Sequence, residues 1–255
     1  MGTNSIITIT AYKRPYYFEE VVHSLEKTGS IEDYDILVSV DGGYPDVQSE
    51  IINIAKNSKL HFDIITHSKN LGCAGNTGYV LKEGFNRADK VIHLEEDIII
   101  SRGYLLYMEQ MLDIFKDSKN VFSITGFSHN KTPDLGLLNR VELVNRFRCV
   151  GWAMWKDRFE EIEDWFGITW KPDKPFNEGN VPEGEEFVKW VNKTDKGSWG
   201  WAMDMYHRNG RCSVAPYVSK SRHIGQCEGT FCKGNEKIKP IWAGNIKQKE
   251  DRIII

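Results

Sequence analysis

Apolar residues in the first half of the chain alternate between two spacings, one typical of strands and one typical of helices. Ser5 to Ala11 reads as a buried strand, and Pro15 then opens a helix whose apolar residues recur at helical spacing. Further strands are expected over Asp35 to Asp41, Phe62 to Thr66 and Val121 to Phe127, and another begins at Val91 and ends at three acidic residues. Further helices are expected around Val47 to Ala55, through Val80, Leu81 and Phe85, and through Leu105, Met108, Leu112 and Phe115.

This alternation predicts an α/β fold with a mostly parallel central sheet and helices on both faces. The pattern fades in the second half, where Lys171 to Gly184 reads as a mobile loop, Trp199 to Asn209 as a helix and Cys212 to Ala215 as a strand. We expect residues 1–255 to form one domain with two lobes, 5–127 and 140–235, that meet near Arg140 to Cys149.

Bulk composition is that of an ordinary globular protein. Of the 255 residues, 40% are hydrophobic and 27% are charged, and the formal net charge of -3 gives no reason to expect nucleic acid as a partner. The five scattered cysteines do not suggest a disulfide framework. No apolar run is long enough to span a bilayer, and no secretory signal is seen at the start. We therefore expect a cytoplasmic protein with at most peripheral membrane attachment, at the inner face.

Three consecutive carboxylates follow a strongly apolar segment. Val91 to Leu94 reads as a buried strand, and Glu95, Glu96 and Asp97 come directly after it. Packing three acids together is costly, because like charges raise one another's pKa, and a divalent cation such as Mn²⁺ or Mg²⁺ removes that cost. The triplet is therefore either a cation–diphosphate site or a solvated acidic loop.

Two other polar segments follow predicted strands. Tyr12, Lys13 and Arg14 come after the first strand, and Asp41 comes after the second. Ligands of parallel sheets bind beyond the carboxyl ends of the strands, so these segments should converge with the acidic triplet. Asp41 can accept hydrogen bonds from a ribose or base, or can serve only as a turn residue before Gly42.

Known nucleotide and hydrolase motifs are missing. The chain has no Walker-type loop, no Gly-x-Gly-x-x-Gly after the first strand and no Gly-x-Ser-x-Gly, which argues against P-loop enzymes, dinucleotide-dependent dehydrogenases and serine hydrolases. In the second half, Asp204 lies among apolar and aromatic residues. Such an acid can act as a general base or can be a helix-surface carboxylate, and Trp152 can pack in the core or line a cleft.

At this point the sequence resembles the GT-A fold glycosyltransferases, and among them N-acetylglucosaminyltransferase I and related bacterial family 2-like sugar transferases. The resemblance rests on five segments in order, from Ser5 to about Phe231. They are Ile7 to Pro15, Val38 to Gly43, Glu95 to Asp97, Val150 to Phe159, and Asp204 with the stretch Gly210 to Pro216 after it. Two departures are that the acidic box reads Glu-Glu-Asp instead of Asp-x-Asp, and that the terminal His of a bacterial Gly-Thr-His motif is Phe231 here.

The resemblance implies a Rossmann-like GT-A fold with a nucleotide-sugar-binding lobe and an acceptor lobe. It implies Asp204 as the catalytic base and Asp97 as the ligand of Mn²⁺ or Mg²⁺, with His223 in place of the missing histidine. The residues expected at the nucleotide sugar are Ala11, Tyr12, Arg14, Asp41, Asn70, Gly72, Asn76, Glu95, Glu96 and Trp152.

The function implied is inverting, metal-dependent transfer of a hexosyl or N-acetylhexosaminyl group from a UDP-sugar to a saccharide or a lipid-linked saccharide, in bacterial surface polysaccharide synthesis. Two alternatives remain at this point. A sugar-phosphate nucleotidyltransferase shares the sheet and the metal–diphosphate chemistry, and a glycan-binding protein can keep the scaffold without catalysis.

Overall fold

A computed structural model of the chain describes residues 4–128, 130, 135–162, 203 and 210–225. The strands are β1 (Ser5–Ala11), β2 (Asp35–Val40), β3 (Asp63–Thr66), β4 (Lys90–Glu95), β5 (Ile98–Ile100), β6 (Val121–Thr125), β7 (Val141–Val144), β8 (Trp152–Trp155), β9 (Cys212–Pro216) and β10 (Ser221–His223). The helices are α1 (Pro15–Glu26), α2 (Pro45–Asn57), α3 (Gly72–Arg87), α4 (Tyr104–Phe115) and α5 (Lys156–Glu160), with short 3-10 turns at Ile31–Asp33 and Leu135–Leu137.

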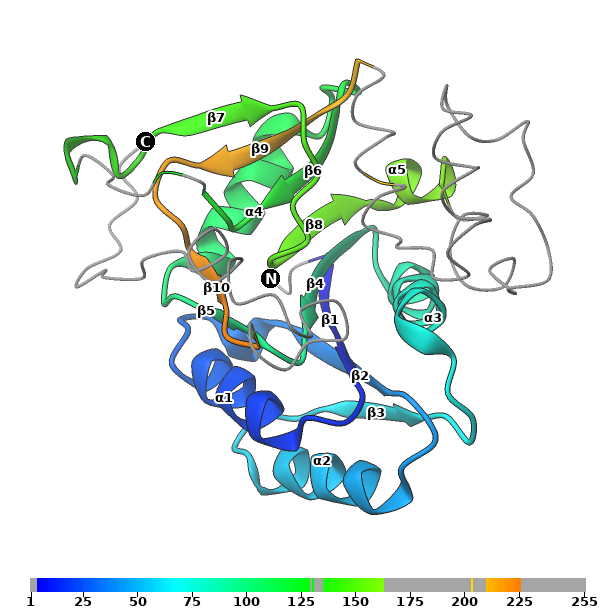
Figure 1. Ribbon diagram of the computed structural model, residues 1–255. Helices are drawn as coiled ribbons and strands as arrows, with labels where there is room; N and C mark the ends of the chain where they lie inside the picture. Colours follow the sequence, from blue (N-terminus) through cyan, green and yellow to red (C-terminus); the bar gives the residue numbers. More distant parts are fainter. Residues whose placement is uncertain (1–3, 129, 131–134, 163–202, 204–209, 226–255) are drawn as a thin grey trace, which may run out of the picture.

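Eight of the strands form one central sheet in the order β3-β2-β1-β4-β8-β6-β9-β7. Strands β8 and β7 run against their neighbours, and the remaining strands of the sheet share one direction. The mostly parallel α/β sheet predicted from the alternating pattern is therefore confirmed. Figure 1 shows β8, from the second half of the chain, between β4 and β6.

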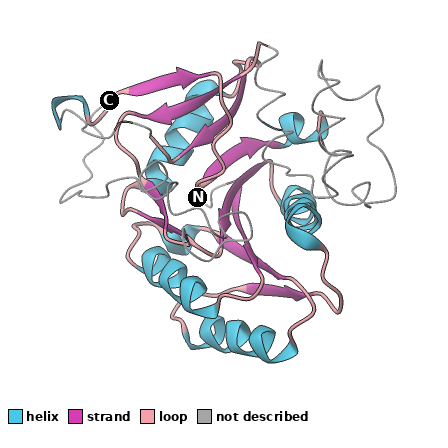
Figure 2. Cartoon of the chain, viewed as in Figure 1, coloured by secondary structure: helices cyan, strands magenta, loops and turns pink. Residues whose placement is uncertain are grey.

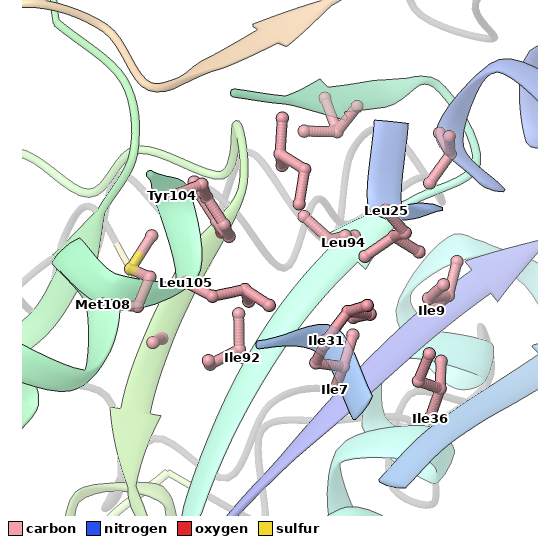
Figure 3. Close-up of a cluster of buried hydrophobic side chains, with 14 of the residues drawn as sticks. Ile7, Ile9, Leu25, Ile31, Ile36, Ile92, Leu94, Tyr104, Leu105 and Met108 are labelled. Atoms are coloured by element: carbon pink, nitrogen blue, oxygen red, sulfur yellow. The ribbon is translucent and has the colours of Figure 1, made fainter. Parts of the chain in front are cut away.

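Helices cover both faces of this sheet (Figure 2). On one face, α1, α2 and α4 pack against apolar side chains of β1, β2 and β4 such as Ile7, Ile36 and Ile92 (Figure 3). On the other face, α3 and α5 pack against the alternate side chains, including Ile6 and Val91. Successive residues of a strand point to opposite faces, so the apolar strands that the sequence predicted supply both cores.

Several boundaries differ from those expected. The strand expected before the acidic triplet ends at Glu95, and an unexpected strand, β5, follows the turn and pairs with β10 in a two-stranded antiparallel sheet. Helix α3 begins at Gly72, inside the segment expected as a loop. The backbone amides of Leu71 and Gly72, at the start of the helix, donate hydrogen bonds to the side chain of Asp41. The predicted loop over 171–184 and most of the predicted helix over 199–209 lie outside the described residues.

The parallel part of the sheet places the predicted strand ends at one edge. Ala11 of β1 is the register partner of Val40 of β2, and Thr10 of β1 is the partner of Glu95 of β4. The polar residues that follow these strands therefore lie side by side, as the sequence predicted. That edge is where the candidate site lies.

Candidate active site

The acidic triplet lies at the end of β4, with Glu95 as its last residue and Glu96 and Asp97 in the turn that leads to β5. Glu96 and Asp97 are 4% and 1% exposed, and Glu95 is half-buried. The apolar residues on either side, Leu94 and Ile98, are both in the core and fix the turn in place. The triplet is therefore not the solvated loop that the sequence left open, and its charges need partners inside the protein.

Arg14 supplies the main compensating charge. It immediately precedes α1, and its Nε donates to Glu96 Oε1 at 2.5 Å, while its Nη1 lies 2.8 Å from Asp97 Oδ2. The backbone amide of Tyr12 also donates to Glu96, through Oε2. The connection between β1 and α1 thus binds two of the three acids.

Strand β10 closes the site from the other side. It pairs with β5 so that His223 lies opposite Ile98, and the next backbone amide, that of Ile224, donates to the Asp97 carbonyl at 2.9 Å. The His223 imidazole Nε2 is 3.3 Å from Asp97 Oδ2. Residues 126 positions apart are brought together here by two short strands.

Gly225 packs directly against this cluster. A Cβ at this position would lie 2.2 Å from Asp97 Oδ2 and 2.7 Å from Arg14 Nη1. Real Cβ atoms do not approach other atoms so closely, so a larger residue would displace the Arg14–Asp97 pair. We did not expect a role for Gly225, because nothing in its sequence neighbourhood shows which side chain it packs against.

Burial shifts the pKa values of the acids and of His223. It raises the pKa of Glu95 to about 8, and the nearby negative charge of Asp97 adds to the shift. Burial also raises the pKa of Glu96, although Arg14 and the Tyr12 amide oppose that shift. The pKa of His223 is lowered by burial, against the opposing effect of Asp97, which favours a neutral imidazole that can act as a metal ligand.

Asp97 has a carboxylate oxygen that is available to a divalent cation. Its Oδ1 is buried and has no hydrogen-bond partner among the described residues. In that part of the chain no three His, Cys, Asp or Glu side chains form a cation cluster by themselves. Mg²⁺ sites commonly use one or two carboxylates together with substrate phosphates, so Asp97 with His223 is a sufficient protein contribution. The donor atoms fit Mn²⁺ or Mg²⁺.

Asp41 organises the neighbouring loop. Its Oδ1 accepts from the backbone amides of Gly42 at 2.8 Å and Leu71 at 2.7 Å, and its Oδ2 accepts from the amide of Gly72 at 3.1 Å. The backbone of Lys69 passes so close to Gly42 that a Cβ there would be 2.4 Å from the Lys69 carbonyl carbon. Asp41 therefore supports the start of α3.

Aromatic side chains form the outer rim of this loop. The Tyr12 and Tyr44 rings meet edge to face with centroids 5.5 Å apart, and Tyr44 is 46% exposed. Asn70 donates from Nδ2 to the Tyr12 hydroxyl at 2.5 Å and accepts the Gly72 amide at 2.6 Å through Oδ1. Tyr12, Asn70 and Gly72 are thus together, as expected, and Tyr44 is an additional member.

Three residues expected at the ligand lie inside the protein. Ala11, at the end of β1, is 2% exposed, and its carbonyl accepts the Asp41 amide. Asn76 is 3% exposed and donates to the Ser39 carbonyl while accepting the Ser39 hydroxyl, so it joins α3 to β2. Trp152 is fully buried against Phe147. The described contacts of all three are with the protein, as are those of Asp41, which is also 3% exposed, so their expected place at the nucleotide sugar stays a prediction.

Asp204 lies outside the described residues. The residue before it, Met203, is fully buried in the core on the α3 face of the sheet. Its predicted role as catalytic base therefore stays a prediction.

Comparison with known proteins finds likeness in structure but not in sequence. No protein-family model and no curated protein matches the sequence. Solved structures match it. S. aureus TarS 1-349 is 12% identical with a TM-score of 0.51, covering 87% of this chain and 60% of that one. GalNAc-T7 with UDP, GalNAc and Mn²⁺ is 10% identical with a TM-score of 0.55, covering 88% of this chain and 44% of that one.

The chain has the GT-A glycosyltransferase fold. A second structure of TarS 1-349, in complex with UDP-GlcNAc, is 14% identical with a TM-score of 0.50 and covers 87% of this chain and 58% of that one. This GT-A chain spans less than two thirds of the length of each of these proteins. The specific likeness to N-acetylglucosaminyltransferase I stays a prediction. Across the described ranges, no helix combines the length and apolar character needed to cross a bilayer.

Proposed function

We propose that this GT-A protein transfers a sugar from a UDP-linked donor to a saccharide hydroxyl, with inversion at the anomeric carbon. The observation that carries the proposal is the buried cluster of Asp97, Glu96, Arg14 and His223 beyond the carboxyl end of β4. It lies where ligands of open parallel sheets bind, and it unites a cation-binding carboxylate with a residue that can contact phosphate.

Donor binding uses the cluster and the adjacent rim. Asp97 and His223 would hold Mn²⁺ or Mg²⁺, and that cation, when bound, neutralises charge on the departing nucleoside diphosphate. Arg14 adds a positive charge beside the diphosphate. Support comes from the similar structures, because TarS was solved with UDP-GlcNAc and GalNAc-T7 with UDP and Mn²⁺.

The nucleoside would lie on the rim formed by Tyr12, Tyr44 and Asn70. Tyr44 exposes an aromatic ring that can stack on a base. Asp41 lies beneath, where its Oδ2 receives one hydrogen bond among the described contacts and Oδ1 receives two. A ribose or base hydroxyl or amide can donate to Oδ2 as well, so Asp41 can both support the loop and contact the nucleoside.

Acceptor activation is assigned to Asp204. As general base it takes the proton of the acceptor hydroxyl while that oxygen attacks the anomeric carbon, an effect typically worth about 10²–10⁴-fold in rate. The acceptor in this proposal is a saccharide or lipid-linked saccharide of a bacterial surface polysaccharide. The protein would work in the cytoplasm, with at most peripheral attachment to the inner face of the membrane.

Sugar transfer by an Asp204→Asn variant tests this assignment. We expect transfer from UDP-sugars to fall by about 10²-fold or more, with UDP affinity nearly unchanged, because the base does not contact the nucleotide. Asp117→Asn, which alters an exposed carboxylate in the turn after α4, should transfer at the wild-type rate. Substantial transfer by Asp204→Asn would refute the base, and pyrophosphate release from UTP and a sugar phosphate would favour a nucleotidyltransferase.

A further inference from the structure

The positive charge of Arg14 lies between two of the buried acids. The Arg14 guanidinium bridges Glu96 Oε1 at 2.5 Å and Asp97 Oδ2 at 2.8 Å. The three side chains are 19%, 5% and 2% exposed, so water screens these charges poorly. A guanidinium paired with two buried carboxylates supplies positive charge where a divalent cation would supply it.

The two oxygens of Asp97 have different surroundings. Oδ2 is surrounded by Arg14, by His223 Nε2 at 3.3 Å and by Gly225, where a Cβ would be 2.2 Å away. Oδ1 is equally buried but has no hydrogen-bond partner in the described part of the chain. A buried carboxylate oxygen without a partner is costly, which points to a ligand at Oδ1.

A cation held by Asp97 and His223 would share the Asp97 carboxylate with the Arg14 guanidinium. Like charges at such a separation repel, and a buried setting strengthens the repulsion. The backbone of Asp97 cannot retreat freely, since its carbonyl accepts the Ile224 amide at 2.9 Å. Relief must come from Arg14, whose long side chain can turn toward a second anion.

We propose that Arg14 is an internal counterion that competes with the divalent cation until the donor diphosphate draws it away from Asp97. The cation would then bind weakly to the free protein and tightly once the diphosphate has engaged Arg14. By linkage the cation must raise the affinity for the nucleotide by the same factor, so metal and donor enter as one cooperative unit. This inference rests on the proposed function, because it assumes a nucleoside diphosphate beside the acids.

Mn²⁺ titration of the nucleotide-free protein, followed by the electron paramagnetic resonance of unbound Mn²⁺ and repeated with saturating UDP, tests this competition. Arg14→Gln should bind Mn²⁺ about tenfold or more tightly than wild type without UDP, since a positive charge within ~4–6 Å shifts such equilibria by one unit or more. UDP should tighten Mn²⁺ binding strongly in the wild type and much less in Arg14→Gln.

Two further variants make the result unambiguous. Arg87→Gln removes an arginine whose Nη1 pairs with Asp63 at 2.6 Å on the surface, and it should bind Mn²⁺ like the wild type. Arg14→Lys keeps the charge but loses the planar guanidinium that contacts both acids, so its Mn²⁺ affinity should lie between those of the wild type and Arg14→Gln. That variant decides the matter if Arg14→Gln does not fold.

Unchanged or weaker Mn²⁺ binding by folded Arg14→Gln, or by Arg14→Lys in its place, would overturn the internal counterion. A purely structural role for Arg14 would give that result, because loss of the bridge would disorder Asp97. The proposed function fails differently. If neither wild type nor variants bind Mn²⁺ with or without UDP, the cation–nucleotide site itself is absent, and with it the basis for competition.

Discussion

At the scale of single residues, the site is a set of buried charges that the protein only partly neutralises. Glu96 has Arg14 and the Tyr12 amide as partners, whereas Asp97 keeps one oxygen without a partner among the described residues. Glu95 responds by holding its proton, with its pKa raised to about 8 by burial and by the negative charge of Asp97. Without a bound cation, the folded protein should therefore lose stability when Glu95 releases its proton.

The stability of the metal-free protein should therefore depend on Glu95 and pH. An unfolded chain releases this proton near pH 4.5, whereas the folded protein keeps it to about pH 8. Between these values the folded state binds more protons, so the contribution of Glu95 to stability falls as pH rises and levels off above about pH 8. Urea unfolding with EDTA should show a smaller fall between pH 5 and 8 for Glu95→Gln than for wild type.

An exposed glutamate provides the control for this pH experiment. Glu50→Gln should keep the pH dependence of the wild type, since Glu50 lies on the outer surface of α2. Identical slopes for Glu95→Gln and wild type would show that Glu95 does not hold its proton in the folded state.

Several site residues were predictable because their signal is local. Asp97, Arg14 and Asp41 each follow an apolar run that reads as a strand, and parallel strands deliver their ends to one edge. Asn76 and Trp152 were also expected at the ligand, and the described contacts of their buried side chains are with the protein. A polar or aromatic residue near a motif looks the same in sequence whether it faces a ligand or the core, since only packing distinguishes the two.

At the scale of elements, the decisive feature is the pairing of β5 with β10. It brings His223 and Gly225 to Asp97, and hydrogen bonds from the Lys220 and Ser221 amides to the Gly126 carbonyl hold the same segment to the end of β6. Neither strand has more than three residues, so neither gives a periodic signal in the sequence. This pairing could not have been predicted from hydrophobic pattern alone.

Replacing Gly225 tests how tightly β10 closes on the acids. A Cβ would meet Asp97 Oδ2 at 2.2 Å and Arg14 Nη1 at 2.7 Å, so Gly225→Ala must push the ion pair apart. We expect a loss of about 1–3 kcal/mol in the free energy of unfolding, the usual cost of overpacking. Chemical denaturation measures this loss directly.

Gly29→Ala is the matched control for that substitution. No atom lies within 4 Å of a Cβ at Gly29, so the added methyl group should cost little or nothing. If Gly225→Ala were as stable as Gly29→Ala, β10 would not be packed against Asp97 in the way described.

At the scale of the whole molecule, one sheet joins both halves of the chain. Strand β8 from the second half lies antiparallel between β4 and β6, and this insertion joins the two halves in one sheet. The first half of the fold follows from its regular strand and helix alternation. The position of β8 in the sheet does not follow from the sequence pattern. Trp152 to Trp155 form a buried four-residue strand, and such a short apolar run is equally compatible with a helix.

Calorimetric titration of UDP, with and without Mn²⁺, tests the central claim that the acids beyond β4 form a cation-dependent donor site. We predict that wild type binds UDP only when Mn²⁺ is present and that Asp97→Asn abolishes most of this binding, while Asp117→Asn keeps it. UDP binding that is equally tight without Mn²⁺ or in Asp97→Asn, or no binding of UDP, GDP or dTDP under any of these conditions, would contradict the account.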